Sequence, residues 1–326
     1  MIERQNYLDI VAYLDYLVDI RQVQDITRGN TQNRLKHLLL WADSRAFTEF
    51  NKIKPTFQKY LESQTNNDGD LLSAAYLTAV FKVTRSFLFW AKREWPIRYK
   101  NIDHNTIEAL RPSRIRSEEA TLKKREIYTL DDMLKIISIK PDTLAERRLI
   151  AGTSFLFLSG MRITAFLSMP IKAFNIDEWS VSQLPELGVK TKNSKAAITY
   201  LLPIPELRRV VSEWDSLVRN AIPDTCNWYA ILGTNDYFTG ERNDATYSHF
   251  NFRKHLKALL GKYGLLYMSP HKFRHGHAVY ALKKAKDMET WKAISQNLMH
   301  SNTGITDGIY GQLVSEDQKR IINDLI

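Results

Sequence analysis

The sequence predicts a mainly α-helical protein that carries one small antiparallel β-sheet. Apolar residues recur at helical spacing through most of the chain, whereas strand-like patterns are confined to residues 174–204. A basic stretch with few large apolar side chains, residues 99–126, separates two such regions. We therefore expect an all-α N-terminal domain over residues 1–98, an interdomain linker over residues 99–126, and an α+β domain over residues 127–326.

The first region and the linker both carry basic side chains. On the last long helix of the N-terminal domain, Lys82 and Arg85 occupy polar positions. The linker adds Arg111, Arg114 and Arg116. These cations are either solvated or follow a phosphate backbone, and we treat them as candidate DNA contacts. The expected helices of this domain cover residues 3–20, 31–43, 47–63 and 71–93.

In the second region, Gly160 breaks a long apolar helix, and Arg162 emerges at the break. A lysine-rich hairpin tip at residues 190–195 lies between two of the expected strands. A later helix bears Arg253 and Lys254, two further candidate DNA contacts. The expected strands cover residues 174–176, 180–182 and 198–204, and the later helices cover residues 205–220 and 246–260.

A helix start at residues 269–270 places His271 and Arg274 on one face of its first turn. The positive end of the helix dipole lies at the same turn, which suits an anion such as phosphate. His300 closes the next helical segment, and Tyr310 follows ten residues later. An anion-binding turn followed by a tyrosine suits attack on a phosphodiester.

The bulk composition narrows the class of partner. The chain has 326 residues, a net charge of +10 and a pI near 9.4, which favours nucleic acid over a membrane surface. The single cysteine, Cys226, excludes an internal disulfide and fits a reducing compartment. With no signal-peptide pattern and no long apolar run, we expect a cytoplasmic protein.

Four elements occur in a specific order: Gly160-Met161-Arg162, the lysine hairpin, His271-x-x-Arg274, and His300 followed by Tyr310. This ordered set resembles the tyrosine recombinase (phage integrase) family, and the resemblance covers the whole chain. It implies a helical core-binding (SAM-like) domain followed by the family's catalytic domain. It also implies a site-specific DNA recombinase that works through a 3′-phosphotyrosyl intermediate and a Holliday junction.

The resemblance assigns roles residue by residue. Arg162 and Arg274 match the two arginines that bind the scissile phosphate, and His271 matches the histidine that exchanges a proton with the nucleophile. His300 matches the position that hydrogen-bonds a non-bridging oxygen, and Tyr310 matches the nucleophile. Lys192 matches the hairpin lysine that protonates the 5′-oxygen, with Lys190 and Lys195 as alternatives. Lys195 and Lys272 are also candidate DNA contacts.

The sequence departs from the family pattern at three places. Ala165 stands where an acidic residue is usual, so another group must orient the site. The interval from His300 to Tyr310 is one residue longer than usual. Gly276 and His277 stand where a small hydroxyl residue and an aromatic residue are common.

The resemblance also implies partners and a tail. We expect DNA core sites, a homo-tetramer on DNA that exchanges C-terminal helices, and accessory DNA-bending proteins in some reactions. The resemblance further implies a prokaryotic-type protein that is associated with the nucleoid. The apolar stripe of a helix at residues 312–326 must be buried, either on its own domain or, as the resemblance implies, on the neighbouring protomer. Neither a cofactor nor a metal is expected. The alternatives are a type IB topoisomerase-like nicking-closing enzyme and a catalytically weakened DNA-binding relative.

Overall fold

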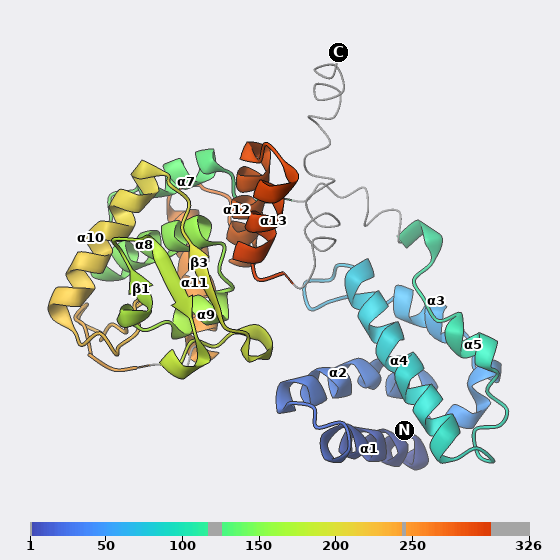
Figure 1. The fold of residues 1–326 in the computed structure, drawn as a ribbon. Helices are drawn as coiled ribbons and strands as arrows, with labels where there is room; N and C mark the ends of the chain where they lie inside the picture. The colour runs from blue at the N-terminus through green and yellow to red at the C-terminus, as the bar shows by residue number, and fades with distance from the viewer. Residues whose placement is uncertain (1, 117–125, 243–245, 301–326) are drawn as a thin grey trace. The chain divides into compact units, whose positions relative to one another are not determined.

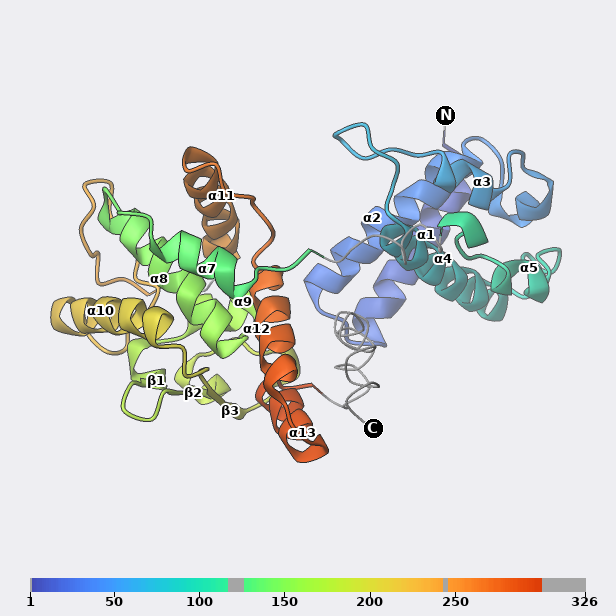
Figure 2. The same ribbon diagram turned by 90° about the horizontal axis from the view of Figure 1, so that it is seen from above.

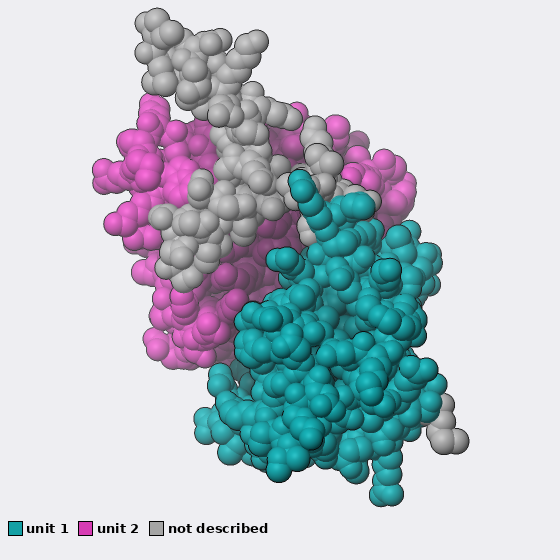
Figure 3. Space-filling model, turned by 90° about the vertical axis from the view of Figure 1, so that its right-hand side faces the viewer, with its two compact units in different colours: residues 1–124 teal, residues 125–326 magenta. Residues whose placement is uncertain are grey.

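The computed structural model describes residues 2–116, 126–242 and 246–300. The chain divides into two compact units, residues 1–124 and residues 125–326 (Figure 3). Most of the described chain is helical, and a three-stranded antiparallel sheet lies in the second unit (Figure 1). These features confirm the fold class expected from the sequence. Among the helices of the described ranges, none is long and apolar enough to cross a membrane.

Unit 1 is a set of helices around a core rich in aromatic side chains. Its longest helix buries Leu77, Phe81 and Phe87 because these residues fall on one face at helical spacing. Ser73 caps this helix by accepting the N–H of Tyr76. The described helices of unit 1 are α1 (Arg4–Asp19), α2 (Asp25–Ala42), the 3-10 helix η1 (Phe47–Lys52), α3 (Phe57–Glu62), α4 (Ala74–Glu94) and α5 (His104–Glu108).

The core of unit 1 extends past the boundary expected from the sequence. Tyr99, Ile102, Ile107 and Leu110 are all buried in it. The Tyr99 hydroxyl also donates a hydrogen bond to the buried carboxylate of Asp9. The first part of the expected linker is therefore part of unit 1, which corrects the boundary. Helix α5 is only five residues long, too short to show the apolar period that reveals a longer helix.

Unit 2 is organised around the central helix α8. Every residue of α8 from Leu149 to Ser159 is buried, because the helix is apolar on all sides and is covered by its neighbours. Helices α7, α10, α11 and α12 contact it (Figures 1 and 2). The helices of this unit are α7 (Leu130–Ile137), α8 (Leu144–Ser159), α9 (Ile163–Ser168), α10 (Pro205–Ala221), α11 (Thr246–Lys262), α12 (His271–Lys284) and α13 (Met288–Asn297), with the 3-10 helices η2 (Ile171–Ala173), η3 (Pro185–Leu187) and η4 (Lys192–Ser194).

The sheet has the order β1-β2-β3, with both pairs antiparallel. In β2 and β3, Ser180 pairs with Tyr200 and Gln183 with Ala197. The last expected strand is shorter than its apolar pattern, because the chain leaves the sheet after Tyr200 and the Leu202 N–H donates to the Leu158 carbonyl of α8, at 2.9 Å. The three strands are β1 (Phe174–Asn175), β2 (Ser180–Gln183) and β3 (Ala197–Tyr200).

Candidate active site

Helix α8 ends at Gly160, and the chain turns there towards Arg162. Gly160 has a φ of +61°, a left-handed conformation that costs glycine little. A Cβ at this position would lie 2.7 Å from a ring carbon of His277 and 2.8 Å from a methyl carbon of Leu298. Both the turn and the close packing of α12 and α13 therefore require glycine. Arg162 follows as the half-buried residue that precedes α9.

Arg274 on α12 bridges the ends of two other helices. Its side chain is almost fully buried, with 4% of its surface exposed. One guanidinium nitrogen, Nη1, donates to the Gly160 carbonyl at 2.6 Å, and Nη2 donates to the Leu298 carbonyl. Because two nitrogens of the planar fork are held by two different segments, the orientation of the guanidinium is fixed before any ligand arrives.

His277 forms a second bridge between α12 and α8, one turn after Arg274. Its Nδ1 lies 2.8 Å from the Phe157 carbonyl. Because a carbonyl only accepts, the ring must carry its proton on Nδ1. Burial lowers the pKa of His277 to about 4, so the imidazole is neutral at pH 7. No sequence motif singled out this residue, and the only signal was its departure from the aromatic residue common in the family.

His271 is the first residue of α12. Desolvation lowers its pKa from the ordinary value, and the charges of Arg274, Arg162 and Lys272 lower it further. The ring of His275 makes an edge-to-face contact with it, with 4.5 Å between centroids. A lowered pKa keeps His271 unprotonated at neutral pH, which is the state that can accept a proton.

The end of α13 sets the position of His300. The Met299 N–H donates to the Gln296 carbonyl at 2.7 Å, and the His300 N–H donates to the Ser295 carbonyl at 3.1 Å. This pair of bonds is a Schellman motif, and it requires the left-handed φ of +54° at Met299. Desolvation lowers the pKa of His300 to about 4, with further contributions from Arg274, Arg162 and His271.

Four of the residues singled out in the sequence thus share one environment. The same two guanidiniums, Arg162 and Arg274, lower the pKa of both His271 and His300. These groups come from the end of α8, the start of α12 and the residues after α13. Two cations beside two neutral imidazoles form a site complementary to an anion with several oxygen atoms. Across the described ranges, no group of three or more His, Cys, Asp or Glu side chains could hold a metal ion.

The lysine hairpin presents its cations to solvent. Lys190, Lys192 and Lys195 are all exposed, so burial does not distinguish among the three. The turn at η4 is formed by left-handed conformations at Asn193 and Ser194, with φ values of +58° and +50°. The base of the hairpin is fixed, because the Lys190 N–H donates to the Ser168 hydroxyl on α9 at 2.8 Å.

Ala165 lies in the apolar core of unit 2, with 2% of its surface exposed. An acidic side chain at this position would be surrounded by apolar groups. The structure shows a different means of orienting the site, because backbone carbonyls at the ends of α8 and α13 hold Arg274. Tyr310 and the expected helix at residues 312–326 lie outside the described residues.

The candidate DNA contacts fall into two groups. Lys272 is half-buried on α12, beside His271. Arg85 and Arg116 are partly buried and hold backbone carbonyls, since Arg85 donates to Leu110 and Arg116 to Leu72. The exposed candidates are Lys82, Arg111, Arg114, Lys195, Arg253 and Lys254.

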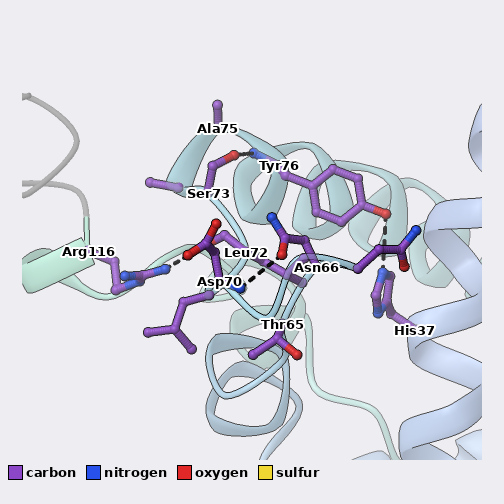
Figure 4. Close-up of a pocket in the computed structure, with 12 residues that line it drawn as sticks. His37, Thr65, Asn66, Asp70, Leu72, Ser73, Ala75, Tyr76 and Arg116 are labelled. Atoms are coloured by element: carbon purple, nitrogen blue, oxygen red, sulfur yellow. Dashed lines mark hydrogen bonds between the residues drawn. The ribbon is translucent and has the colours of Figure 1, made fainter.

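An open pocket of about 1020 Å³ lies in unit 1, at the start of α4 (Figure 4). His37 Nε2 lies 3.1 Å from the Tyr76 hydroxyl on one side of it. Asn66 accepts the Asp70 N–H at 2.9 Å in the loop that forms another side. No candidate catalytic residue lines this pocket, so it is separate from the site in unit 2.

Comparison with solved structures supports the fold. A Tn1549 transposon integrase in complex with a circular intermediate DNA superimposes with a TM-score of 0.65 and 14% identity, covering 95% of each chain. The lambda integrase (residues 75–356) bound to DNA gives a TM-score of 0.57 and 16% identity, covering 91% of each chain. At these identities the likeness establishes a shared fold along nearly the whole chain.

No family model matches the sequence. Proteins named tyrosine recombinase XerC, from Escherichia coli and Escherichia fergusonii, are each 24% identical over 316 residues. Each match covers 94% of this chain and 92% of the relative. Over nearly its whole length the chain is similar to tyrosine recombinases. This confirms the resemblance on which the roles of the ordered motif rest.

Within the tyrosine recombinase fold, this chain anchors two side chains of α12, Arg274 and His277, on backbone carbonyls. Phe157, Gly160 and Leu298 each offer a carbonyl to a side chain of α12. Arg162 and His300, which come from segments far apart in the sequence, lie beside Arg274. Four residues of the ordered motif, Arg162, His271, Arg274 and His300, are therefore found at one junction of α8, α12 and α13.

Proposed function

We propose that this protein is a site-specific DNA recombinase that cleaves and rejoins DNA through a 3′-phosphotyrosyl intermediate. The observation that carries the proposal is the junction of α8, α12 and α13, where Arg162, His271, Arg274 and His300 share one electrostatic environment. The tyrosine recombinase relatives match 94% of the chain, which supports assigning DNA clamping to unit 1 and catalysis to unit 2.

The junction suits phosphoryl transfer, a reaction catalysed mainly by positioning and by stabilising charge. Arg162 and Arg274 bind the non-bridging oxygens of the scissile phosphate and stabilise the pentavalent transition state. His300 donates a hydrogen bond to one of these oxygens. Because Arg274 is already held by two carbonyls, little reorganisation is needed when the phosphate enters.

In the cleavage step, the Tyr310 oxygen attacks phosphorus while the bond from phosphorus to the 5′-oxygen breaks. His271 accepts the phenol proton, which a neutral imidazole can do. Lys192 gives a proton to the departing 5′-oxygen. The reverse sequence, with a 5′-hydroxyl from a partner strand as the attacking group, rejoins the DNA. The covalent bond conserves the energy of the phosphodiester, so the proposed cycle consumes no nucleotide.

The proposed substrate is a pair of inverted core half-sites bound by four protomers on two duplexes. Exposed cations on both units supply candidate phosphate contacts, among them Lys82, Arg111, Arg253 and Lys254. Exchange of the C-terminal segment between protomers would couple assembly to placement of Tyr310. We propose accessory DNA-bending proteins only for DNA in which binding sites for such proteins flank the core site.

The direct test is to trap the covalent complex. The full-length protein first selects its core site from a random duplex library, and that site is then nicked next to the scissile phosphate. We expect a protein–DNA adduct that resists denaturation and is absent with Tyr310→Phe. A wild-type protein that binds the selected site and forms no adduct would disprove the enzyme proposal.

A relaxation assay separates the recombinase from a nicking-closing enzyme. A plasmid without the selected site, treated at low protein concentration, should keep its supercoils. A plasmid with two selected sites should give recombinant circles. Efficient relaxation of both plasmids with no recombinant product would favour the topoisomerase-like alternative.

A further inference from the structure

Strand β3 lies at the edge of the sheet, on the side towards α13 (Figure 2). There, the amide of Asn297 pairs with the backbone of Tyr200. The Tyr200 N–H donates to Asn297 Oδ1 at 2.7 Å, and Asn297 Nδ2 donates to the Tyr200 carbonyl at 3.0 Å. A primary amide presents one donor and one acceptor side by side, so it binds a strand edge as a neighbouring strand would.

A third bond makes the connection rigid. The Thr199 hydroxyl donates to the backbone carbonyl of Asn297 at 3.2 Å and accepts from Gln183 on β2 at 2.6 Å. Both the side chain and the backbone of Asn297 are therefore bonded to β3. An isolated side-chain contact to an exposed strand could be lost without consequence, but this set fixes the last turn of α13 against two strands.

The position of Asn297 in the chain gives this connection its significance. The next residue, Leu298, offers the carbonyl that holds Arg274, and His300 follows within the same Schellman turn. On the other side of the connection, Tyr200 is the last residue of the strand that leads directly from the lysine turn at Lys192. Asn297 thus joins the phosphate-binding junction to the hairpin that carries the lysine.

The hairpin needs such a connection because its tip is open to solvent. Lys192 is exposed, and a lysine side chain has four rotatable carbons with no preferred direction of its own. The direction in which the lysine can reach is set by the base of the hairpin. One leg is held by the bond from Lys190 to Ser168. The other leg, β3, is paired with β2 and is joined to α13 at Tyr200 by Asn297.

We infer that Asn297 is a positioning residue that keeps the lysine hairpin in register with the phosphate-binding junction. It contacts neither substrate nor reacting atoms, and it acts through Lys192. The inference rests on the proposed function, since it assigns Asn297 to the step in which the 5′-oxygen leaves. It predicts that loss of the amide impairs proton donation more than phosphate binding.

A substrate with sulfur in place of the bridging 5′-oxygen separates these two effects. A thiolate leaves without a proton because thiols are far more acidic than alcohols, with a pKa of ~8.5 for a cysteine side chain. Cleavage of the sulfur substrate therefore needs the arginines and the nucleophile but not the lysine. The nicked core-site duplex, made with either bridging atom, provides a matched pair of substrates.

The main variant is Asn297→Leu, which removes both amide bonds at similar volume. We expect cleavage of the oxygen substrate to fall about 100-fold, at the lower end of the range for general acid catalysis. Cleavage of the sulfur substrate should stay within about 3-fold of wild type, well below that general-acid range. Lys192→Ala should show the same selectivity.

A second variant, Asn297→Asp, tests the same effect if the leucine variant does not fold. It keeps the acceptor for the Tyr200 N–H but places a carboxylate against the Tyr200 carbonyl.

Asn175→Ala is the matched control. Asn175 lies in β1, at the opposite edge of the sheet, and its side chain accepts two backbone N–H groups of a turn. Its loss removes as many hydrogen bonds from the sheet without affecting α13, so both substrates should be cleaved at nearly the wild-type rate.

The outcomes are distinct. Equal losses of Asn297→Leu on the oxygen and sulfur substrates, or no loss on either, would overturn the positioning role while leaving the recombinase intact. A wild-type protein that forms no adduct with either substrate would overturn the proposed function, and the inference with it.

Discussion

The phosphate-binding junction and the lysine hairpin are constructed in opposite ways. At the junction, Arg274 is buried and bonded to two carbonyls, and His277 is buried and bonded to a third. At the hairpin, Lys192 is exposed at the tip of a turn. Groups that stabilise charge work best when they are fixed in advance, because no reorganisation is then needed during reaction. A proton donor, in contrast, must reach its leaving group only when the DNA is bound.

This contrast predicts which substitutions respond to a change of leaving group. Arg274→Lys should reduce cleavage on the order of 10³-fold, because a lysine can replace neither the fork nor its two carbonyl bonds. The loss should be the same on the oxygen and sulfur substrates, measured as the rate of adduct formation. Rescue by sulfur would show that Arg274 assists the leaving group and would remove the distinction between the two regions.

The junction should also make stability depend on pH. The pKa of the buried His277 is about 4 in the folded protein against 6.5 normally, so the unfolded chain binds more protons between these values. Stability is therefore fully present above pH 6.5 and is lost as the pH falls towards 4. The expected loss from this one group is on the order of 3 kcal/mol. Thermal unfolding of unit 2 across this range measures it, and a flat profile would contradict the assignment.

The sequence predicts those parts of the two regions that depend on residue type and spacing, and it does not predict the parts that depend on backbone groups. Arg162, His271, Arg274 and His300 were singled out because the ordered motif fixes residue type and spacing, and the structure brings these four together. The carbonyls that hold Arg274 and His277 were not predicted. Backbone carbonyls carry no residue identity, so the three that bond to α12 left no pattern to recognise.

Side chains whose hydrogen-bond partners are backbone groups were also missed, because those partners leave no pattern in the sequence. Asn297 resembles any polar residue at the end of a helix until its partner, Tyr200, is known from the fold. The boundary of unit 1 was misplaced because Tyr99 and Leu110 reach the core from short segments with no sustained period. The fold class was accessible because long helices such as α4 and α8 repeat their pattern over many turns.

Replacing His277 tests the junction without touching a proposed catalytic group. His277→Phe keeps the ring shape but leaves the Phe157 carbonyl without this donor inside the core. An unpaired buried carbonyl costs roughly 1–3 kcal/mol, so we expect the melting temperature at pH 7.5 to fall by several degrees. His255→Phe on the exposed face of α11 is the control and should melt within a degree of wild type. Equal melting of His277→Phe and wild type would mean that the bond contributes nothing to the junction.

The smallest expected effect concerns the residue that sets His300 in place. Met299 adopts a left-handed conformation with a φ of +54°, which costs a side-chain-bearing residue roughly 1–2 kcal/mol and glycine almost nothing. Replacing methionine by glycine removes this cost, but part of the stability gained is offset because glycine loses more chain entropy on folding. Met299→Gly should therefore raise the free energy of unfolding by about 0.5–1 kcal/mol, measured by denaturant titration. Because the Schellman bonds are made by the backbone, adduct formation should be unchanged. A destabilised variant would show that the methionine side chain, and not the turn, holds the end of α13 at the junction.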